Sequence, residues 1–136
     1  MYLLIDGGTT QTRVICSDGK LISLCAASHV GAGNNAHLAE FVRETLAAHA
    51  SKDTVVIASG MIGSKTGLCE IPHLPAPAGI PELHAGIRKI HLPEISPLAI
   101  HFIPGVKKQA ANADNTDVMR GEETALYGLC ENAEAD

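Results

Sequence analysis

Residues 3–16, LLIDGGTTQTRVIC, decide the fold that the sequence predicts. A short apolar run ends at Asp6, a polar loop with two glycines and two threonines follows, and a second apolar run begins at Val14. Short apolar runs separated by a Gly-rich segment are typical of buried strands joined by a turn. We therefore expect two neighbouring strands with a polar loop at their shared end.

The residues of this loop suit a site for phosphate and a metal ion. Asp6 follows a buried strand and offers a carboxylate, a ligand that Mg²⁺ accepts. Gly7 and Gly8 lack side chains, so backbone N–H groups can approach phosphate oxygens, and Thr9 and Thr10 add hydroxyl donors. The loop is not a Walker loop, because it lacks the Gly-x-x-x-x-Gly-Lys-Ser/Thr pattern. The alternative is an ordinary Gly-rich hairpin turn that contains an aspartate.

Length and composition indicate one ordinary globular domain. The chain has 136 residues, of which 46% are hydrophobic and 18% charged, and its formal net charge is −5. A chain of this size can bury a sizeable core. It has no basic run and few aromatic side chains, so we expect no nucleic-acid partner. No apolar stretch has the length of a membrane span, and the N-terminus lacks the pattern of a signal peptide, so we expect a cytoplasmic protein.

The cysteines and histidines show no spacing typical of a metal site. The four cysteines form no C-x-x-C pair, and the seven histidines are scattered. Cys16 and Cys25 lie inside apolar runs, so we expect both to be reduced core residues of a cytosolic protein. On this evidence the sequence predicts no zinc site.

Along the rest of the chain, strand-like runs give way to segments with helical periodicity. Four prolines between residues 72 and 81 exclude a helix or a central strand there. Three antiparallel strands, followed by strands reached through helices, predict an α/β fold with a mixed five-stranded sheet and flanking helices. The expected strands cover 2–6, 12–17, 21–27, 54–58 and 98–103, and the expected helices 36–50, 82–90 and 118–131.

The predicted last helix carries charges in unusual places. Glu122 lies one turn from both Val118 and Leu126 on the apolar stripe, where a carboxylate costs free energy unless it is paired or faces a cleft. Arg120 is a cation in the first turns, where the helix dipole favours anions, so it would suit an anionic ligand. The alternative is an internal ion pair, with Asp117 serving only as the N-cap.

Several segments, in order along the whole chain, resemble one family. It is the bacterial 2-dehydro-3-deoxygalactonokinases, which belong to the actin-like ATPase and sugar kinase superfamily. IDGGTTQTR at 5–13 looks like the family's Asp-Trp-Gly-Ser/Thr-Thr-Asn-x-Arg phosphate loop, and ASGMIGS at 58–64 is similar to its Ala-Gly-Met-Val/Ile-Gly-Ser turn. LPAPAG at 74–79, FIPGV at 102–106 and DVMRGEET at 117–124 also match, the last being the most specific. Gly7 and Gln11 depart from the pattern, which usually has Trp and Asn there.

The resemblance implies an actin-like (ribonuclease H-like) fold and a family of much longer enzymes. We therefore expect residues 1–136 to be a single N-terminal lobe of a two-lobe sugar kinase. The C-terminal lobe, with a second phosphate loop and the adenosine pocket, would be absent from this chain.

The resemblance also implies a reaction, the phosphorylation of the 6-hydroxyl of 2-dehydro-3-deoxygalactonate by ATP with Mg²⁺. Asp6 would hold Mg²⁺ through water, and Gly8, Thr9 and Thr10 would cradle the phosphates. Arg13 would either neutralise charge beside them or pair at the surface.

The same resemblance assigns residues to the sugar acid. Arg120 would hold the substrate carboxylate as a bidentate fork. Glu122 or Asp117 would accept the proton of the attacking hydroxyl, and we favour Glu122 because of its stripe position. The strand-end loop would line the sugar-acid site with Gly60, Met61 and Ser64.

We expect the isolated chain to fold but to be inactive, because both walls of a kinase cleft are needed to exclude water and orient ATP. A second hypothesis is a non-catalytic half-kinase that binds a sugar acid or a partner protein. An apolar lobe interface left exposed would favour self-association. A third is another carbohydrate kinase of the same superfamily.

Overall fold

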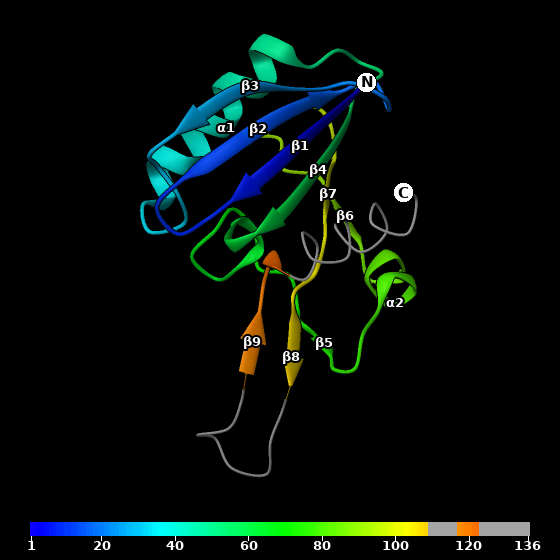
Figure 1. Cartoon of the computed structure of the whole chain (residues 1–136). Helices are drawn as coiled ribbons and strands as arrows, with labels where there is room; N and C mark the ends of the chain where they lie inside the picture. The colour runs from blue at the N-terminus through cyan, green and yellow to red at the C-terminus, as the bar shows by residue number, and fades with distance from the viewer. Residues whose placement is uncertain (109–116, 123–136) are drawn as a thin grey trace.

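The computed structural model describes residues 1–108 and 117–122. Most of its strands belong to one mixed sheet, which a helix covers on one face (Figure 1). The sheet has six strands in the order β3-β2-β1-β4-β7-β6. Their bounds are β1 Tyr2–Gly7, β2 Thr12–Ser17, β3 Ile22–Ser28, β4 Val55–Gly60, β6 Arg88–Ile90 and β7 Ile100–Phe102. The helix α1 (Asn35–His49) lies across one face of this sheet.

The core lies between α1 and the middle of the sheet. Leu38, Val42 and Leu46 recur at helical spacing, so they share one face of α1 and are buried. They pack with alternate residues of the strands, among them Leu3 and Ile5 of β1, because side chains of a strand alternate between the two faces of the sheet. Each such side chain contributes about 1.5–3 kcal/mol when it is fully buried. This core fixes β1, whose end carries Asp6.

β1 lies between strands of opposite direction. It pairs antiparallel with β2 and parallel with β4, which places Gly7 opposite Gly60. β4 in turn pairs parallel with β7. The parallel strands β1 and β4 therefore end at the same edge of the sheet, and the segments that follow them lie side by side.

A second, small sheet continues from this edge. Its strands are β5 (Leu74–Pro75), β8 (Val106–Lys108) and β9 (Asp117–Met119), in the order β5-β8-β9. Figure 1 shows the end of β9 beside η1 (Met61–Gly63), the short helical turn that follows β4. The proline-rich segment 72–81 contributes the edge strand β5. Its last residues, Ile80 and Pro81, begin a helix, so the expectation of no helix there is wrong at its end.

The predicted helix 118–131 is wrong at its start. Asp117–Met119 is the strand β9, and it pairs antiparallel with β8 so that Val118 lies opposite Lys107. Gly121 then adopts a φ of 108°, which a right-handed helix does not use. Asp117 is therefore no N-cap, and the helical spacing assigned to Glu122 does not apply. Residues 123–131 lie outside the described part.

The expected helix 82–90 is shorter and earlier than predicted. The helix α2 spans Ile80–Ala85, with Pro81 in its first turn, where a missing N–H does no harm. After Gly86 the chain forms β6, which pairs antiparallel with β7. The main sheet therefore has six strands rather than the five predicted.

Cys16 and Cys25 form a disulfide between β2 and β3, so the expectation that both are reduced is wrong for this structure. Their Cα atoms are 5.9 Å apart, because a hairpin joins the two strands. This separation is within the about 4.4–6.8 Å that disulfides usually span.

Along the described residues, no helix has the length and apolar character that crossing a membrane requires.

Candidate functional site

A polar pocket of about 320 Å³ lies where β1 and β4 end. Three stretches of chain build it, because the parallel pairing of β1 with β4 and the course of β9 bring their ends together. Its lining comprises Asp6, Gly7, Gly8 and Thr9 after β1, Gly60 and Met61 after β4, and Arg120, Gly121 and Glu122 after β9. Ligands of α/β sheets commonly bind at such strand ends.

Three glycines form the floor of this pocket. Gly60 has a φ of 89°, and a Cβ there would lie 2.5 Å from the carbonyl oxygen of Gly7. A Cβ on Gly121 would lie 2.9 Å from the Cα of Gly60, and one on Gly7 would lie 2.7 Å from the Cβ of Ile62. The three strand ends therefore touch through bare backbone. A side chain at position 7 would require Ile62 to move.

The carboxylate of Asp6 faces solvent and is paired. Its Oδ2 accepts a hydrogen bond from Nη2 of Arg13 at 2.7 Å, and the two side chains are 47% and 63% exposed. Such exposed ion pairs contribute about 0–1 kcal/mol, so the bond can be exchanged at little cost. The pairing of Arg13 at the surface is one of the two roles that the sequence left open for it.

The hairpin loop after Asp6 is fixed by its own hydrogen bonds. The N–H of Gly8 donates to the carbonyl oxygen of Gln11 at 2.8 Å. The carbonyl oxygens of Gly8 and Thr9 accept from Ala32 and Gly33 of the neighbouring loop, at 2.9 and 2.8 Å. The Gly8 N–H is therefore engaged in the turn, whereas Thr9 and Thr10 are exposed.

Arg120 is a buried cation that holds backbone carbonyls. The residue is 8% exposed, its Nη1 donates to Gly63 at 2.7 Å, and its Nη2 donates to Ile71 at 2.8 Å and lies beside the ring of His73. These bonds tie the end of β9 to the segment that follows β4.

Glu122 lies at the mouth of the pocket. Its residue is exposed, and its Oε2 accepts a hydrogen bond from the backbone N–H of Arg120 at 3.0 Å. The carboxylate is thereby held close to the chain while its surface stays open to solvent. The sequence reasoning selected this residue, although the helix on which it relied is not formed at Val118.

Three described residues expected in the site do not line the pocket. Thr10 is not among the residues that line it, and Arg13 borders a separate hollow with Gln11 and His29. The hydroxyl of Ser64 donates to the carbonyl oxygen of Met61 at 2.6 Å and supports the turn from behind. Asp117 belongs to β9, and its side chain lies outside the described part of the structure.

The sequence reasoning missed Gly121 and the loop around Gly31. Gly121 lies in the pocket and adopts a positive φ, for which a glycine is the usual residue. A Cβ on Gly31 would overlap the carbonyl oxygen of Gly8, so this loop can pack against the hairpin only because a glycine stands there. The Gly-rich composition of 31–33 was the available signal, but it did not reveal the contact.

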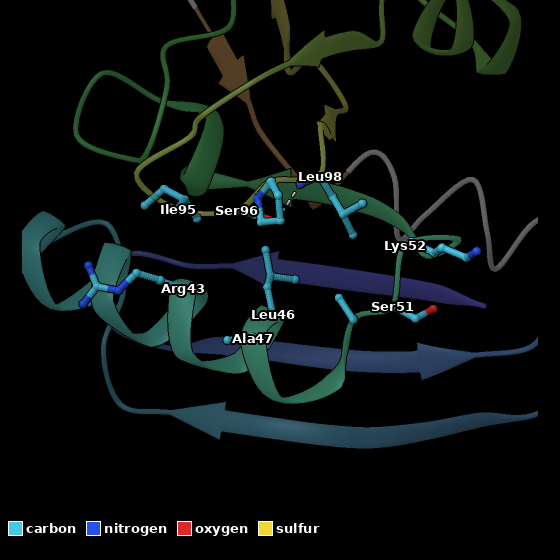
Figure 2. A pocket seen from close by; sticks show the side chains of 10 residues that line it. Arg43, Leu46, Ala47, Ser51, Lys52, Ile95, Ser96 and Leu98 are labelled. Atoms are coloured by element: carbon cyan, nitrogen blue, oxygen red, sulfur yellow. Dashed lines mark hydrogen bonds between the residues drawn. The ribbon is translucent and has the colours of Figure 1, made fainter.

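A larger hollow, of about 590 Å³, lies elsewhere (Figure 2). Figure 2 shows Leu46 of α1 pointing toward the segment that carries Ile95, Ser96 and Leu98, with Arg43 to one side. It is mostly apolar and shares no lining residue with the pocket at Asp6. Size alone would favour this hollow, but the convergent polar groups lie in the smaller pocket.

Comparisons with known proteins agree with the sequence resemblance. The sequence model of the 2-keto-3-deoxy-galactonokinase family matches residues 6–136. The chain is 30% identical over 129 residues to the 2-dehydro-3-deoxygalactonokinase of Escherichia coli K12, a match that covers 93% of the chain and 41% of that relative. A solved structure from Sinorhizobium meliloti, named as a candidate 2-dehydro-3-deoxygalactonokinase, superposes with a TM-score of 0.79 at 27% identity and covers 98% of the chain.

The chain matches only part of each of these relatives. The chain spans about two-fifths of the length of these relatives, 41% of one and 43% of the other. The superposition confirms the expected actin-like α/β lobe, with its three leading antiparallel strands. Since the family model matches nearly every residue, the chain belongs to the 2-keto-3-deoxy-galactonokinase family.

Proposed function

We propose that this chain forms the N-terminal lobe of an ATP-dependent kinase that phosphorylates the 6-hydroxyl of 2-dehydro-3-deoxygalactonate. The observation that carries the proposal is the pocket at the ends of β1 and β4, where Asp6, the hairpin loop and Glu122 converge in a chain of this family. In this proposal the protein works in the cytoplasm, where ATP is available.

Asp6 has the chemistry that a magnesium site requires. Mg²⁺ prefers oxygen ligands, keeps several waters and is usually held by one or two carboxylates and by substrate phosphates. Asp6 is half exposed, and the pocket in front of it has room for hydrating water. Asp6 would hold the ion, and the bound ion would neutralise phosphate charge. Arg13 then stays beside Asp6 as a second positive charge.

The phosphate-binding role falls mainly on Thr9, which lines the pocket, with Thr10 next to it in the loop. Both are exposed beyond Asp6, while the Gly8 N–H is already engaged within the turn. Gly8 contributes by carrying no side chain, which leaves the pocket open at that point. The bonds to Ala32 and Gly33 hold the loop in place before the ligand arrives, so little ordering remains to be done on binding.

Glu122 is the group that we assign to accept the proton of the attacking hydroxyl. It borders the same pocket as Asp6, it is exposed, and the Arg120 N–H holds one of its oxygens. A general base must lie within hydrogen-bond reach of the proton that it takes. Asp117 stays the alternative candidate for this role.

The sugar acid would lie on the side formed by Gly60 and Met61, with Ser64 supporting the turn from behind. Arg120 would act as a positioning residue, because its terminal nitrogens hold Gly63 and Ile71 and thereby fix the backbone that carries Gly121 and Glu122.

Turnover of the isolated chain tests the lobe assignment. One lobe supplies only one wall of the cleft, so mixing the 136-residue chain with 2-dehydro-3-deoxygalactonate and Mg·ATP should give no phosphorylated product. Turnover at the rate of a full-length family enzyme would contradict the proposal that a second lobe is required.

A binding module without catalysis is the second candidate. Leu21, Ile22 and Leu24, at the start of β3 and along it, are 76%, 71% and 64% exposed, which favours contact with a partner or with a second copy of the chain. Titration calorimetry separates the candidates, since a sugar-acid sensor should bind 2-dehydro-3-deoxygalactonate tightly without ATP. A panel of sugars with the full-length kinase would reveal a different carbohydrate substrate.

A further inference from the structure

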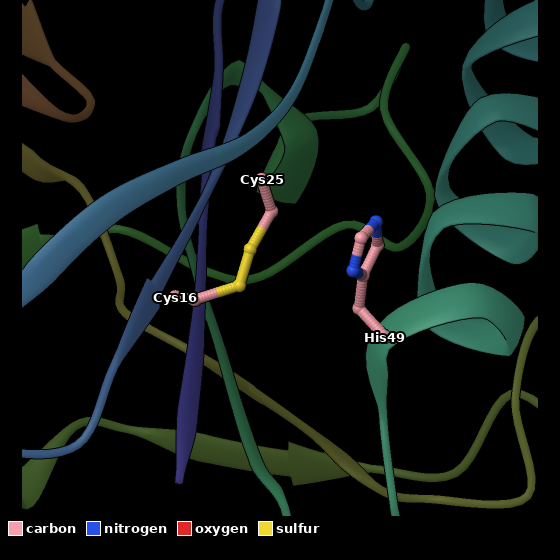
Figure 3. Close-up of side chains that lie close together, drawn as sticks. All are labelled: Cys16, Cys25 and His49. Atoms are coloured by element: carbon pink, nitrogen blue, oxygen red, sulfur yellow. A yellow bond between two sulfur atoms is a disulfide. The ribbon is translucent and has the colours of Figure 1, made fainter.

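Three potential metal ligands lie together outside the pocket. The Sγ atoms of Cys16 and Cys25 and a ring nitrogen of His49 all lie within 4.8 Å of one another. Cys16 belongs to β2, Cys25 to β3, and His49 is the last residue of α1. Figure 3 shows the imidazole beside the two sulfur atoms. The cluster therefore joins three separate elements.

A β-bulge brings the two cysteines to the same place. In the pairing of β2 with β3, Val14 lies opposite Ala26 and Ile15 lies opposite Leu24, so Cys25 has no partner on β2. A bulge of this kind turns the side chain of the extra residue. Cys25 is thereby aimed at Cys16, toward the side of the sheet where His49 ends α1.

Two thiolates and one imidazole form a donor set that zinc prefers. Zn²⁺ takes cysteine sulfur at about 2.3 Å and histidine nitrogen at about 2.0–2.1 Å, usually in a tetrahedron. Donor atoms around one such ion lie under about 4 Å apart, a separation that small side-chain movements reach from the observed cluster. Mg²⁺ prefers oxygen ligands and binds thiolates poorly, so this site would not compete with Asp6 for its ion.

We propose that Cys16, Cys25 and His49 bind one Zn²⁺ ion when the disulfide is reduced. A dithiol reductant supplies two electrons that break the S–S bond; the reductant becomes a disulfide, and both cysteines become thiols. Zinc then binds the two thiolates, and two protons leave to solvent. A small-molecule disulfide reverses the process: it accepts the two electrons and two protons and becomes two thiols, the bond between Cys16 and Cys25 forms again, and the ion is released. The disulfide and the zinc complex therefore exclude each other.

The ion has a route into the site. His49 is exposed, and both cysteines are only partly buried. Cys16 also borders a shallow surface hollow of about 200 Å³ beside Met1 and Asp18. Three protein ligands leave a fourth position, which water can fill. The cytosol keeps thiols reduced, so the reduced form is the one expected there.

Metal titration of the reduced chain tests this inference without any assay of activity. The chain is reduced with a dithiol, desalted under nitrogen and titrated with Co²⁺, whose thiolate complexes absorb in the near ultraviolet. We expect one equivalent to bind with thiolate-to-cobalt charge-transfer absorption, and Zn²⁺ to displace it. The chain with its disulfide intact should show no such absorption.

Variants separate this site from the other cysteines. Cys16→Ser and Cys25→Ser should abolish the charge-transfer absorption at one equivalent, whereas a variant with both Cys69→Ser and Cys130→Ser should keep it. His49→Gln changes an exposed side chain and leaves the fold intact. Because it removes a direct ligand, it should weaken Zn²⁺ binding by more than about 10-fold, the smallest loss expected when only a partner of a ligand is removed. Absence of binding by the reduced, folded chain, or unchanged binding by His49→Gln, would overturn the proposal.

Discussion

Arg120 and Arg13 show how the same residue type serves two purposes in this chain. Arg120 is buried and donates to the carbonyl oxygens of Gly63 and Ile71, whereas Arg13 is exposed and pairs with Asp6. A charged hydrogen bond in a buried place contributes about 1.5–3 kcal/mol, and an exposed ion pair about 0–1 kcal/mol. The sequence left a role beside the ligand and a structural role open for both arginines, because it gives no measure of burial.

The two arginines can be compared by the same substitution. Arg120→Met should lower the free energy of unfolding by about 2–4 kcal/mol, since two carbonyls lose their donors inside the protein. Arg13→Met serves as the control and should lower it by less than about 1 kcal/mol. Urea denaturation followed by circular dichroism measures both. Equal losses would contradict a structural role for Arg120.

Gly60 and Gly19 provide a second matched pair. Both adopt a positive φ, 89° and 98°, but a Cβ on Gly19 meets nothing within 4 Å, whereas one on Gly60 meets Gly7. Gly19→Ala should cost about 1–2 kcal/mol from backbone strain alone. Gly60→Ala should cost about 1–3 kcal/mol more, because the strand ends must separate. If thermal unfolding gives the same loss for both variants, the strand ends do not touch as described.

Asp18 gives a prediction about pH. Hydrogen bonds from the backbone N–H groups of Leu21 and Lys20 hold the pKa of the Asp18 carboxyl below its ordinary value. A lowered pKa means that the ionised form favours the folded turn, so this contribution is present above the unfolded-state pKa and is lost as pH falls through the folded-state pKa. An NMR titration of the carboxyl carbon should find the shift. A value at or above the ordinary one would contradict these bonds.

At the scale of elements, the leading strands, α1 and the later strands β4 and β7 were predicted, whereas the strands β6 and β9 were predicted as helices. The apolar runs of 3–5 and 14–16 and the stripe of Leu38, Val42 and Leu46 are local signals, because each element buries one face. The helix predicted from 118 failed because Asp117–Met119 pairs with β8, a partner that no local pattern reveals. β6 was missed for the same reason, since it exists through its pairing with β7.

The bulge in β3 also escaped prediction. Cys16 and Cys25 are 9 residues apart, and nothing in that spacing shows that Cys25 lacks a partner on β2. Seven of the residues assigned to the site border one pocket: Asp6, Gly8, Thr9, Gly60, Met61, Arg120 and Glu122. Their roles stay predictions, which rest mainly on resemblance to a family and do not depend on the predicted secondary structure.

The hairpin that carries the disulfide should be a measurable source of stability. Closing a loop with a sequence separation of 9 restricts the unfolded chain, and the chain-entropy model gives about 2–3 kcal/mol for this. Reduction should therefore lower the urea midpoint, and Zn²⁺ added to the reduced chain should raise it again, because the ion binds the folded form. Cys69→Ser should leave the midpoint of the oxidised chain unchanged. A urea midpoint that does not change on reduction would contradict the stabilising role of the disulfide.

At the scale of the whole molecule, the chain presents one wall of a proposed cleft. The pocket of about 320 Å³ at Asp6 is open to solvent. In the proposal, the remaining groups of the ATP site belong to a second lobe. The relatives are longer, since the matches cover 41% and 43% of their lengths. The central claim is therefore best tested where a second lobe is supplied.

The most direct measurement uses a chimera in which residues 1–136 replace the matched region of the Escherichia coli relative. This chimera should phosphorylate 2-dehydro-3-deoxygalactonate with Mg·ATP. Asp6→Asn should lower kcat by about 100-fold or more, because it removes the carboxylate proposed to hold Mg²⁺, the ion that would neutralise phosphate charge in the transition state. Asp18→Asn, an exposed aspartate outside the pocket, should leave kcat unchanged. An active chimera whose kcat does not respond to Asp6→Asn would contradict the account.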